Sequence, residues 1–456
     1  MDRGEAQLFI DDEVIESHTR VHRAIHQPQR FGPDPILRPE RPWEGNCICL
    51  YGTVLRSPDT GLYHIYYQTF NKVAPPENTY ICCATSADGL NWEKPELGDV
   101  PYRGSRRNNI ILAGFHGGVD SPSVILDPGE PDARRRYKLL TYGRGPDGRG
   151  GLYAAFSADG LHWQALPEPV APSVGDRTNV MLDPGKPRPY VAYTRRHTMM
   201  QDHARRTVYR SDSADFLEWS DPRLALAPDL ADHYDIQFYG FSAFRYESIY
   251  VGLIQVLHSQ EDVQDIQLAV SRDNVTWRRV EPRQVFFPRG RRDGWEGAWV
   301  CVASNPPLER DGRLWFYYEG RTESHGQAWP FPRGAIGVAV LRRDGFASLD
   351  AGPVEAHVTT RPFAWPGGRL LVNLDCKAAV GATEGAQQVG FARLEVLDDA
   401  GNPVPGFTRD ECETFRGDAL DHEFAWPGTT LDALKGKAIR LRFWLVNASL
   451  YGFRVA

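Results

Sequence analysis

The chain has 456 residues, of which 41% are hydrophobic and 24% are charged, and this balance excludes a mainly disordered protein. Its 59 acidic residues outnumber the 52 basic ones, giving a formal net charge of −7, so no nucleic-acid partner is expected. No stretch approaches the roughly 18 uncharged apolar residues of a membrane span, and the first residues lack the pattern of a secretory signal. We therefore expect a cytoplasmic protein with no membrane partner.

A seven-residue motif recurs along the first three quarters of the chain. Its clearest copies, at 86–92 and 157–163, both read Ser-Ala-Asp-Gly-Leu-x-Trp. Weaker copies lie at 213–219 and 271–277, and a degenerate fifth lies at 343–346. The Asp-Gly or Asp-Asn pair favours a tight turn, and the Asp carboxylate can accept backbone N–H groups within it. We interpret the motifs as structural turns of a repeat architecture.

Three β-rich segments accompany each copy of the motif, and long helical patterns are nearly absent. The segments leading directly into the motifs are 80–84, 151–156, 207–209, 266–270 and 336–340. Three strands per unit, five times over, predict a five-bladed β-propeller. Short alternating runs without the motif follow and predict a β-sandwich. The predicted fold is thus all-β, with a propeller domain at 1–350 and a sandwich domain at 351–456.

One acidic residue stands at the entry of the first strand of each predicted blade. These residues are Glu44, Asp120, Asp176, Asp235 and Glu296. Corresponding positions of radial blades converge on the axis, so the sequence predicts a ring of carboxylates at one mouth of the channel. Crowded carboxylates raise one another's pKa, which suits the protonated acid and ionised partner of glycoside hydrolysis. The alternative is that the acids cap strands or hold a structural cation such as Ca²⁺. We expect neither a metal nor a cofactor.

Aromatic and polar residues near these acids suit a carbohydrate partner. The predicted substrate contacts are Trp43, Asn46, Arg177, Asn179, Gln237, Tyr239, Trp295, Arg321 and His325. Tyr234 offers a further apolar face, and His116 is equally consistent with a sugar contact or a surface loop. The seven Cys residues form no C-x-x-C pair, which favours free thiols over a zinc site or a disulfide framework. Oligomeric state is not predicted.

Several stretches carry a family resemblance that spans nearly the whole chain. They are 8–12, Pro42-Trp43-Glu44-Gly45, 51–55, the repeated motifs and 447–453. The chain resembles the five-bladed glycosidase clan of fructofuranosidases and arabinofuranosidases, and most of all proteins labelled glycosyl hydrolase family 32-like. The resemblance implies catalytic acids from the first three blades, here Glu44, Asp120 and Asp176. The W-M-N-D-P-N-G, R-D-P and E-C signatures of the clan are absent, and Glu296 is a rival proton donor.

The expected function is a glycosidase that cleaves a furanoside, fructosyl or arabinosyl, or a related small glycoside with two of these carboxylates. Two alternatives stay open. One is a non-catalytic carbohydrate-binding propeller, because one or two substitutions in the ring suffice to remove catalysis. The other is a sialidase-like enzyme, because the repeated motifs are similar to sialidase Asp boxes, although those boxes have one more residue between Asp and Gly.

Overall fold

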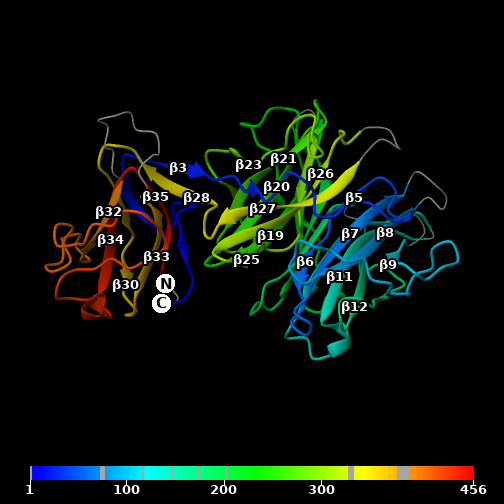
Figure 1. The fold of residues 1–456 in the computed structure, drawn as a ribbon, viewed down its shortest axis with the longest axis horizontal. Helices are drawn as coiled ribbons and strands as arrows, with labels where there is room; N and C mark the ends of the chain where they lie inside the picture. The colour runs from blue at the N-terminus through cyan, green and yellow to red at the C-terminus, as the bar shows by residue number, and fades with distance from the viewer. Residues whose placement is uncertain are drawn as a thin grey trace.

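The computed structural model describes residues 3–71, 78–114, 118–145, 147–172, 175–200, 203–326, 333–376 and 390–456. Within these ranges the regular structure is β-strand, apart from two short 3₁₀ helices at Ala133–Arg135 and Leu431–Leu434. None of the helices in this part of the chain has the length and apolarity needed to cross a membrane. The prediction of an all-β propeller followed by a sandwich is confirmed, and Figure 1 shows the two bodies side by side.

Five antiparallel sheets follow one another along the chain as the blades of the propeller. Blade one contains β5 (Ile48–Cys49), β6 (Val54–Arg56), β7 (Tyr63–Asn71), β8 (Asn78–Ser86) and β9 (Ile110–Ala113). Blade two contains β10 (Val119–Leu126), β11 (Tyr137–Arg144), β12 (Gly150–Ser157), β13 (Gln164–Ala165) and β14 (Ala171–Pro172). Blade three contains β15 (Thr178–Leu182), β16 (Tyr190–Met200), β17 (His203–Ser213) and β18 (Arg223–Leu226).

The last two blades are joined by a single parallel bridge between Gln264 and Trp299. Blade four contains β19 (Ile236–Tyr246), β20 (Ile249–His258), β21 (Val263–Ser271), β22 (Arg278–Arg279) and β23 (Val285–Phe287). Blade five contains β24 (Trp299–Val302), β25 (Leu308–Arg310), β26 (Arg313–Arg321), β27 (Gly334–Arg342) and the early strand β4 (Gln29–Arg30). Because β4 pairs with β27, a segment from the start of the propeller completes its last blade and closes the ring.

The repeated motifs form the turns that their sequence predicts. Asp88 Oδ1 accepts the backbone N–H groups of Leu90 and Asn91 at 2.9 and 2.8 Å and the hydroxyl of Ser86 at 3.0 Å. The same three bonds recur at Asp159, Asp215 and Asp273. The next residue has a positive φ in each turn, which explains the preference for Gly or Asn there. These carboxylates are structural.

The sandwich draws strands from both ends of the chain. One sheet has the order β3 (Val21–Ile25), β28 (Ala347–Ala351), β35 (Ala448–Val455), β31 (Leu370–Asp375) and β33 (Asp418–His422), with β1 (Gln7–Leu8) also on β35. The other has the order β2 (Ile15–Thr19), β29 (Ala356–Thr360), β34 (Ala438–Val446) and β30 (Phe363–Ala364), with β32 (Phe391–Leu397) also on β34. Strand pairing therefore groups residues 7–25 with the sandwich, whereas the predicted division assigned all of 1–350 to the propeller.

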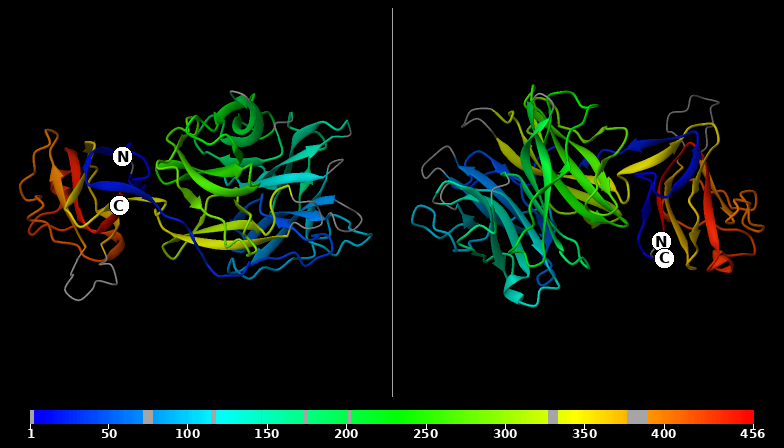
Figure 2. Two further views of the ribbon diagram at one scale, coloured as in Figure 1. Left: turned by 90° about the horizontal axis from the view of Figure 1, so that it is seen from above. Right: turned by 180° about the vertical axis from the view of Figure 1, so that it is seen from behind.

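The sandwich and the propeller contact each other through charged and apolar residues. Arg454 of β35 lies 3.1 Å from Asp344, which stands in the degenerate fifth motif, and 3.5 Å from Glu247 of blade four. Arg272 in the fourth motif pairs with Asp11 at 2.6 Å. The N-terminal segment also packs apolar side chains into the core between blades four and five. Figure 2 shows the two bodies and the segments that join them from two further sides.

Candidate functional site

In the structure two of the predicted acids, Asp120 and Asp176, lie close enough for the charge of one to act on the other. Asp120 lies near the start of β10, where a β-bulge follows and Ser121 adopts a φ of 53°. Its carboxylate accepts the Ser121 hydroxyl at 2.6 Å and the Gln68 amide at 3.3 Å. Burial and the nearby Asp176 charge raise the pKa of Asp120 to about 6, against the opposing effects of Ser121, Arg177 and Gln68.

Asp176 stands just before β15 and is the more exposed member of the pair, with 40% of its side chain accessible. The Arg195 guanidinium of β16 forms an ion pair with its carboxylate. Gly175 permits this approach, because a Cβ at that position would lie 1.9 Å from the carbonyl oxygen of Arg195. The pair thus combines a carboxyl group with a raised pKa and a carboxylate held by a cation, two different electrostatic environments within one site.

A buried arginine, Arg177, is linked to Asp120 of the pair through hydrogen bonds. Arg177 donates from Nη1 to the Ser121 hydroxyl at 3.0 Å and from Nη2 to the Gln255 amide oxygen at 2.9 Å. Its guanidinium lies over the Tyr51 ring, 3.9 Å from the centroid. Because Ser121 in turn donates to Asp120, Arg177 orients the acid through one intermediate side chain. The sequence predicted Arg177 as a direct substrate contact. Because Arg177 is buried, its position instead favours a role in holding neighbouring side chains.

Aromatic residues of blades four and five pack against one another beside Arg195. The Tyr239 hydroxyl lies 3.2 Å from Nε2 of His325, and both rings contact Trp299. Burial and the charge of Arg321 lower the pKa of His325. Arg321 is itself buried, where it contacts Glu319 and donates to the Tyr51 hydroxyl at 2.6 Å. Tyr239 and His325 are therefore adjacent, whereas the guanidinium of Arg321 is bonded to the buried residues Glu319 and Tyr51.

Glu44 does not join the Asp120–Asp176 pair. Its side chain is fully buried, and Oε2 accepts the backbone N–H of Arg41 at 2.8 Å and the ammonium of Lys94 at 2.9 Å. Oε1 accepts the Tyr67 hydroxyl at 2.6 Å. A carboxylate with so many protein donors has a structural role, so the prediction of Glu44 as a catalytic acid is corrected. Its neighbour Trp43 is also buried and donates to Asn109 at 2.9 Å.

Asp235 and Glu296 are likewise held by their own partners. Asp235 pairs with His233 at 2.6 Å, and Glu296 pairs with Arg30 of the closing strand β4 at 2.8 Å. The Arg30 guanidinium also lies over the Phe287 ring, which ties β4 to blade five. The predicted ring of five carboxylates is therefore not formed, because Lys94, His233 and Arg30 hold three of its members in separate contacts.

The remaining predicted contacts divide between structure and surface. Asn179 is buried and bonds the backbone of Ser304 and Ala243, so it joins blades rather than facing a ligand. Asn46 and Trp295 line one surface pocket together with Arg38, Pro39, Gly45, Asp293, Gly294, Thr322, Arg333, Gly334 and Ala335. The Gln237 amide oxygen accepts a hydrogen bond from Arg206. Tyr234 is exposed, and His116 lies outside the described residues.

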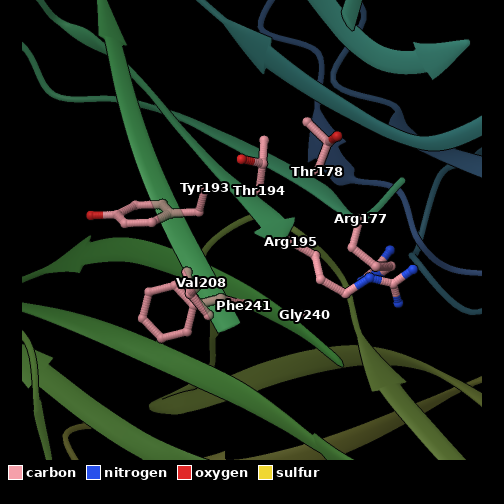
Figure 3. Close-up of a pocket in the computed structure, with 8 residues that line it drawn as sticks. All are labelled: Arg177, Thr178, Tyr193, Thr194, Arg195, Val208, Gly240 and Phe241. Atoms are coloured by element: carbon pink, nitrogen blue, oxygen red, sulfur yellow. The ribbon is translucent and has the colours of Figure 1, made fainter. Parts of the chain in front are cut away.

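Sequence reasoning missed three charged residues near the pair. Arg195 and Arg206 lie on the hairpin of β16 and β17, and Glu319 lies within the apolar strand β26. The signal for the arginines was the pair of basic runs at 195–196 and 205–206. The signal for Glu319 was a lone acid in a run of aromatic residues. Figure 3 shows Arg177 and Arg195 directed to the same side of a small pocket between β15, β16, β17 and β19.

No cluster of three or more His, Cys, Asp or Glu residues suited to a metal ion occurs in the described ranges. All seven cysteines are buried free thiols. Within this site Asp120 and Asp176 are neighbouring carboxyl groups, and Arg195 pairs with Asp176 and lies over the Tyr239 ring.

The fold is similar to solved structures of glycoside-active proteins. One is a structure of BT0996 described as an RGII complex, with a TM-score of 0.52 and 13% identity over 70% of this protein and 92% of the other. Another is described as "Glycoside hydrolase", with a TM-score of 0.52 and 14% identity over 69% of this protein and 92% of the other. Identities this low show a shared fold alone. No protein-family model matches the sequence, and no curated protein matches it either.

Proposed function

We propose that the protein is a glycoside hydrolase that uses Asp120 and Asp176 as its two carboxyl groups. The observation that carries the proposal is the difference between their environments. Asp120 has a pKa of about 6, raised by burial and by Asp176, while Asp176 is paired with Arg195. Glycoside hydrolysis requires this combination of a protonated acid and an ionised partner.

In the proposed mechanism Asp120 donates a proton to the departing glycosidic oxygen. The Asp176 carboxylate acts on the opposite side, either on the anomeric carbon or on a water molecule that attacks it. Ser121 and Gln68 hold the Asp120 carboxyl group in place through the bonds described above. His325, whose side chain is 33% exposed, provides the adjacent surface on which a sugar ring packs, and the buried Tyr239 holds His325 through its hydroxyl.

The substrate class in this proposal comes from the family resemblance. A family 32-like protein implies a fructosyl or arabinosyl furanoside, or a related small glycoside. The fold comparisons support a carbohydrate partner, since the similar structures described above are a glycoside hydrolase and an RGII complex.

Hydrolysis of a panel of aryl furanosides, aryl pyranosides and natural oligosaccharides tests the proposal. We expect Asp120→Asn and Asp176→Asn each to lower kcat at least ~10³-fold on a substrate that the wild type cleaves. Asp235→Asn is the matched control, because it makes the same change at a carboxylate outside the pair, and it should lower kcat less than about threefold.

Equal losses in all three variants would contradict the assignment of the pair and favour a shared carboxylate ring. Binding of oligosaccharides without turnover of any substrate in the panel would contradict the enzyme and favour a carbohydrate-binding propeller.

A further inference from the structure

Two arginines next to the proposed pair lie unusually close to each other. In the hairpin of β16 and β17, Arg195 is opposite Val208 and His197 is opposite Arg206, so both arginines are on one face at neighbouring cross-strand positions. Both guanidinium groups lie near the Tyr239 ring, with Cζ at 4.4 and 5.8 Å from its centroid. Placing two cations side by side costs free energy unless an anion lies between or beside them.

The protein's own carboxylates satisfy only part of this charge. Asp176 pairs with Arg195, whereas the hydrogen-bond acceptor of Arg206 is the neutral amide of Gln237. Among the described residues, the acidic groups that act on Arg206 are Asp176 and Asp262, which do so from a distance. Burial and the charge of Arg195 together lower the pKa of Arg206, so its cation is poorly stabilised by the protein itself.

Two nitrogen atoms in this cluster also lack acceptors. Among the described residues, neither Nη1 of Arg195 nor Nε of Arg206, both buried, has a hydrogen-bond partner. Buried donors of charged groups are normally satisfied, because an unpaired buried donor destabilises the protein. Arg177 adds a third cation that acts on Arg195, and it is fully committed to Ser121, Gln255 and Tyr51. The cluster therefore carries both excess positive charge and unused donors.

We propose that Arg195 and Arg206 form an oxyanion subsite that binds a carboxylate carried by the sugar substrate, beside the Asp120–Asp176 pair. Guanidinium groups recognise carboxylates and phosphates through directed, charge-assisted hydrogen bonds. This inference rests on the proposed function for its location and deepens it by naming the substrate class, a glycoside that contains a uronic acid. Inorganic phosphate has the same oxyanion chemistry and is the other source to be distinguished.

Binding to the full-length protein, measured by titration calorimetry, tests the subsite without requiring turnover. The ligands are matched pairs that differ only in oxidation at C6: D-galacturonate against D-galactose, and D-glucuronate against D-glucose. Inorganic phosphate is titrated separately. The variants are Arg206→Gln, which removes the charge and leaves the Arg195–Asp176 ion pair, and Arg206→Lys, which keeps the charge. Arg196→Gln is the matched control, because Arg196 lies on the opposite face of the same hairpin.

We expect at least one uronate to bind the wild type about tenfold or more tightly than its neutral partner. Arg206→Gln should remove that preference, Arg206→Lys should keep most of it, and Arg196→Gln should leave it unchanged. Equal binding of acidic and neutral sugars, or a preference that survives Arg206→Gln, would overturn the inference. Tighter binding of phosphate than of either uronate, lost in Arg206→Gln, would assign the subsite to phosphate and overturn the substrate carboxylate.

These outcomes are separable from those of the hydrolysis assay. A uronate preference that depends on Arg206 without any turnover supports the subsite and contradicts the glycosidase. Turnover of neutral glycosides, together with equal binding of uronates and neutral sugars, supports the glycosidase and contradicts the subsite.

Discussion

Replacing Asp120 by Asn should change how the stability of the protein depends on pH. The folded state holds the pKa of Asp120 at about 6, whereas an unfolded Asp titrates near 3.9. Protonation therefore favours the folded state. This contribution is complete below about pH 4 and is lost as the pH rises through about 6.

The size of the effect follows from the pKa difference. A shift of about two units corresponds to about 3 kcal/mol at full ionisation, since each unit is worth about 1.36 kcal/mol. Between pH 4 and pH 8 the change is about 2 kcal/mol, because an unfolded Asp is already partly ionised at pH 4. Asp120→Asn cannot ionise, so its free energy of unfolding relative to wild type should rise by about 2 kcal/mol between these two values.

The assay is urea unfolding of both proteins at pH 4 and pH 8, followed by tryptophan fluorescence. Because Asn does not titrate, the double difference cancels any effect of the substitution that is the same at both pH values and leaves the part that comes from ionisation of Asp120. Asp235→Asn is a control of opposite sign. Although burial alone would raise its pKa, bonds from His233 and the Gln260 N–H hold the pKa of Asp235 below its usual range. That variant should lose more stability at pH 8 than at pH 4. A double difference near zero for Asp120→Asn, or one with the sign of Asp235→Asn, would refute the reasoning.

Two further predictions concern activity and the buried ion pair. On a substrate found in the panel, kcat/KM should fall about tenfold per pH unit above about pH 6, as Asp120 loses its proton; a profile that stays level to pH 8 would remove Asp120 as the acid. Lys94→Met should destabilise the protein by about 3–5 kcal/mol in urea unfolding, because it leaves the buried Glu44 without its cation. Adding Glu44→Gln to Lys94→Met should recover part of that loss, and no recovery would contradict a charge effect.

The parts of the fold that could be predicted from sequence are those set by local chemistry. The turn at Asp88 is complete within seven residues, since Ser86, Asp88 and the following N–H groups bond one another. Five such motifs, each with alternating strands before it, were enough to indicate the blades. The strands β1 to β3 were assigned to the wrong body because their partners are distant, as in the pairing of Gln7 with Phe453. Nothing in a two-residue strand specifies so remote a neighbour.

The candidate site shows the same limit at the level of side chains. Glu44 and Glu296 both occur in the sequence Trp-Glu-Gly at the entry of a blade, and this shared context suggested a shared role. In the structure Glu44 forms an ion pair with Lys94, and Glu296 forms one with Arg30. No local sequence pattern indicates either partner. Asp120 and Asp176 do lie in one site, because they stand at the same position of neighbouring blades. The arginines of β16 and β17 became visible only with the hairpin register.

The order of the strands also constrains when the molecule can become complete. Residues 7–25 are synthesised long before their partners, which are strands that begin at residue 347 or later. At about 5–20 residues per second, roughly a quarter of a minute to a minute separates the synthesis of these partners. During that time β1 to β3 have no partner strands to pair with, and β4 stays unpaired until β27 has been made. The strands of the propeller are therefore all synthesised while β1 to β3 are still unpaired, and the sandwich cannot be completed until β35 has been made.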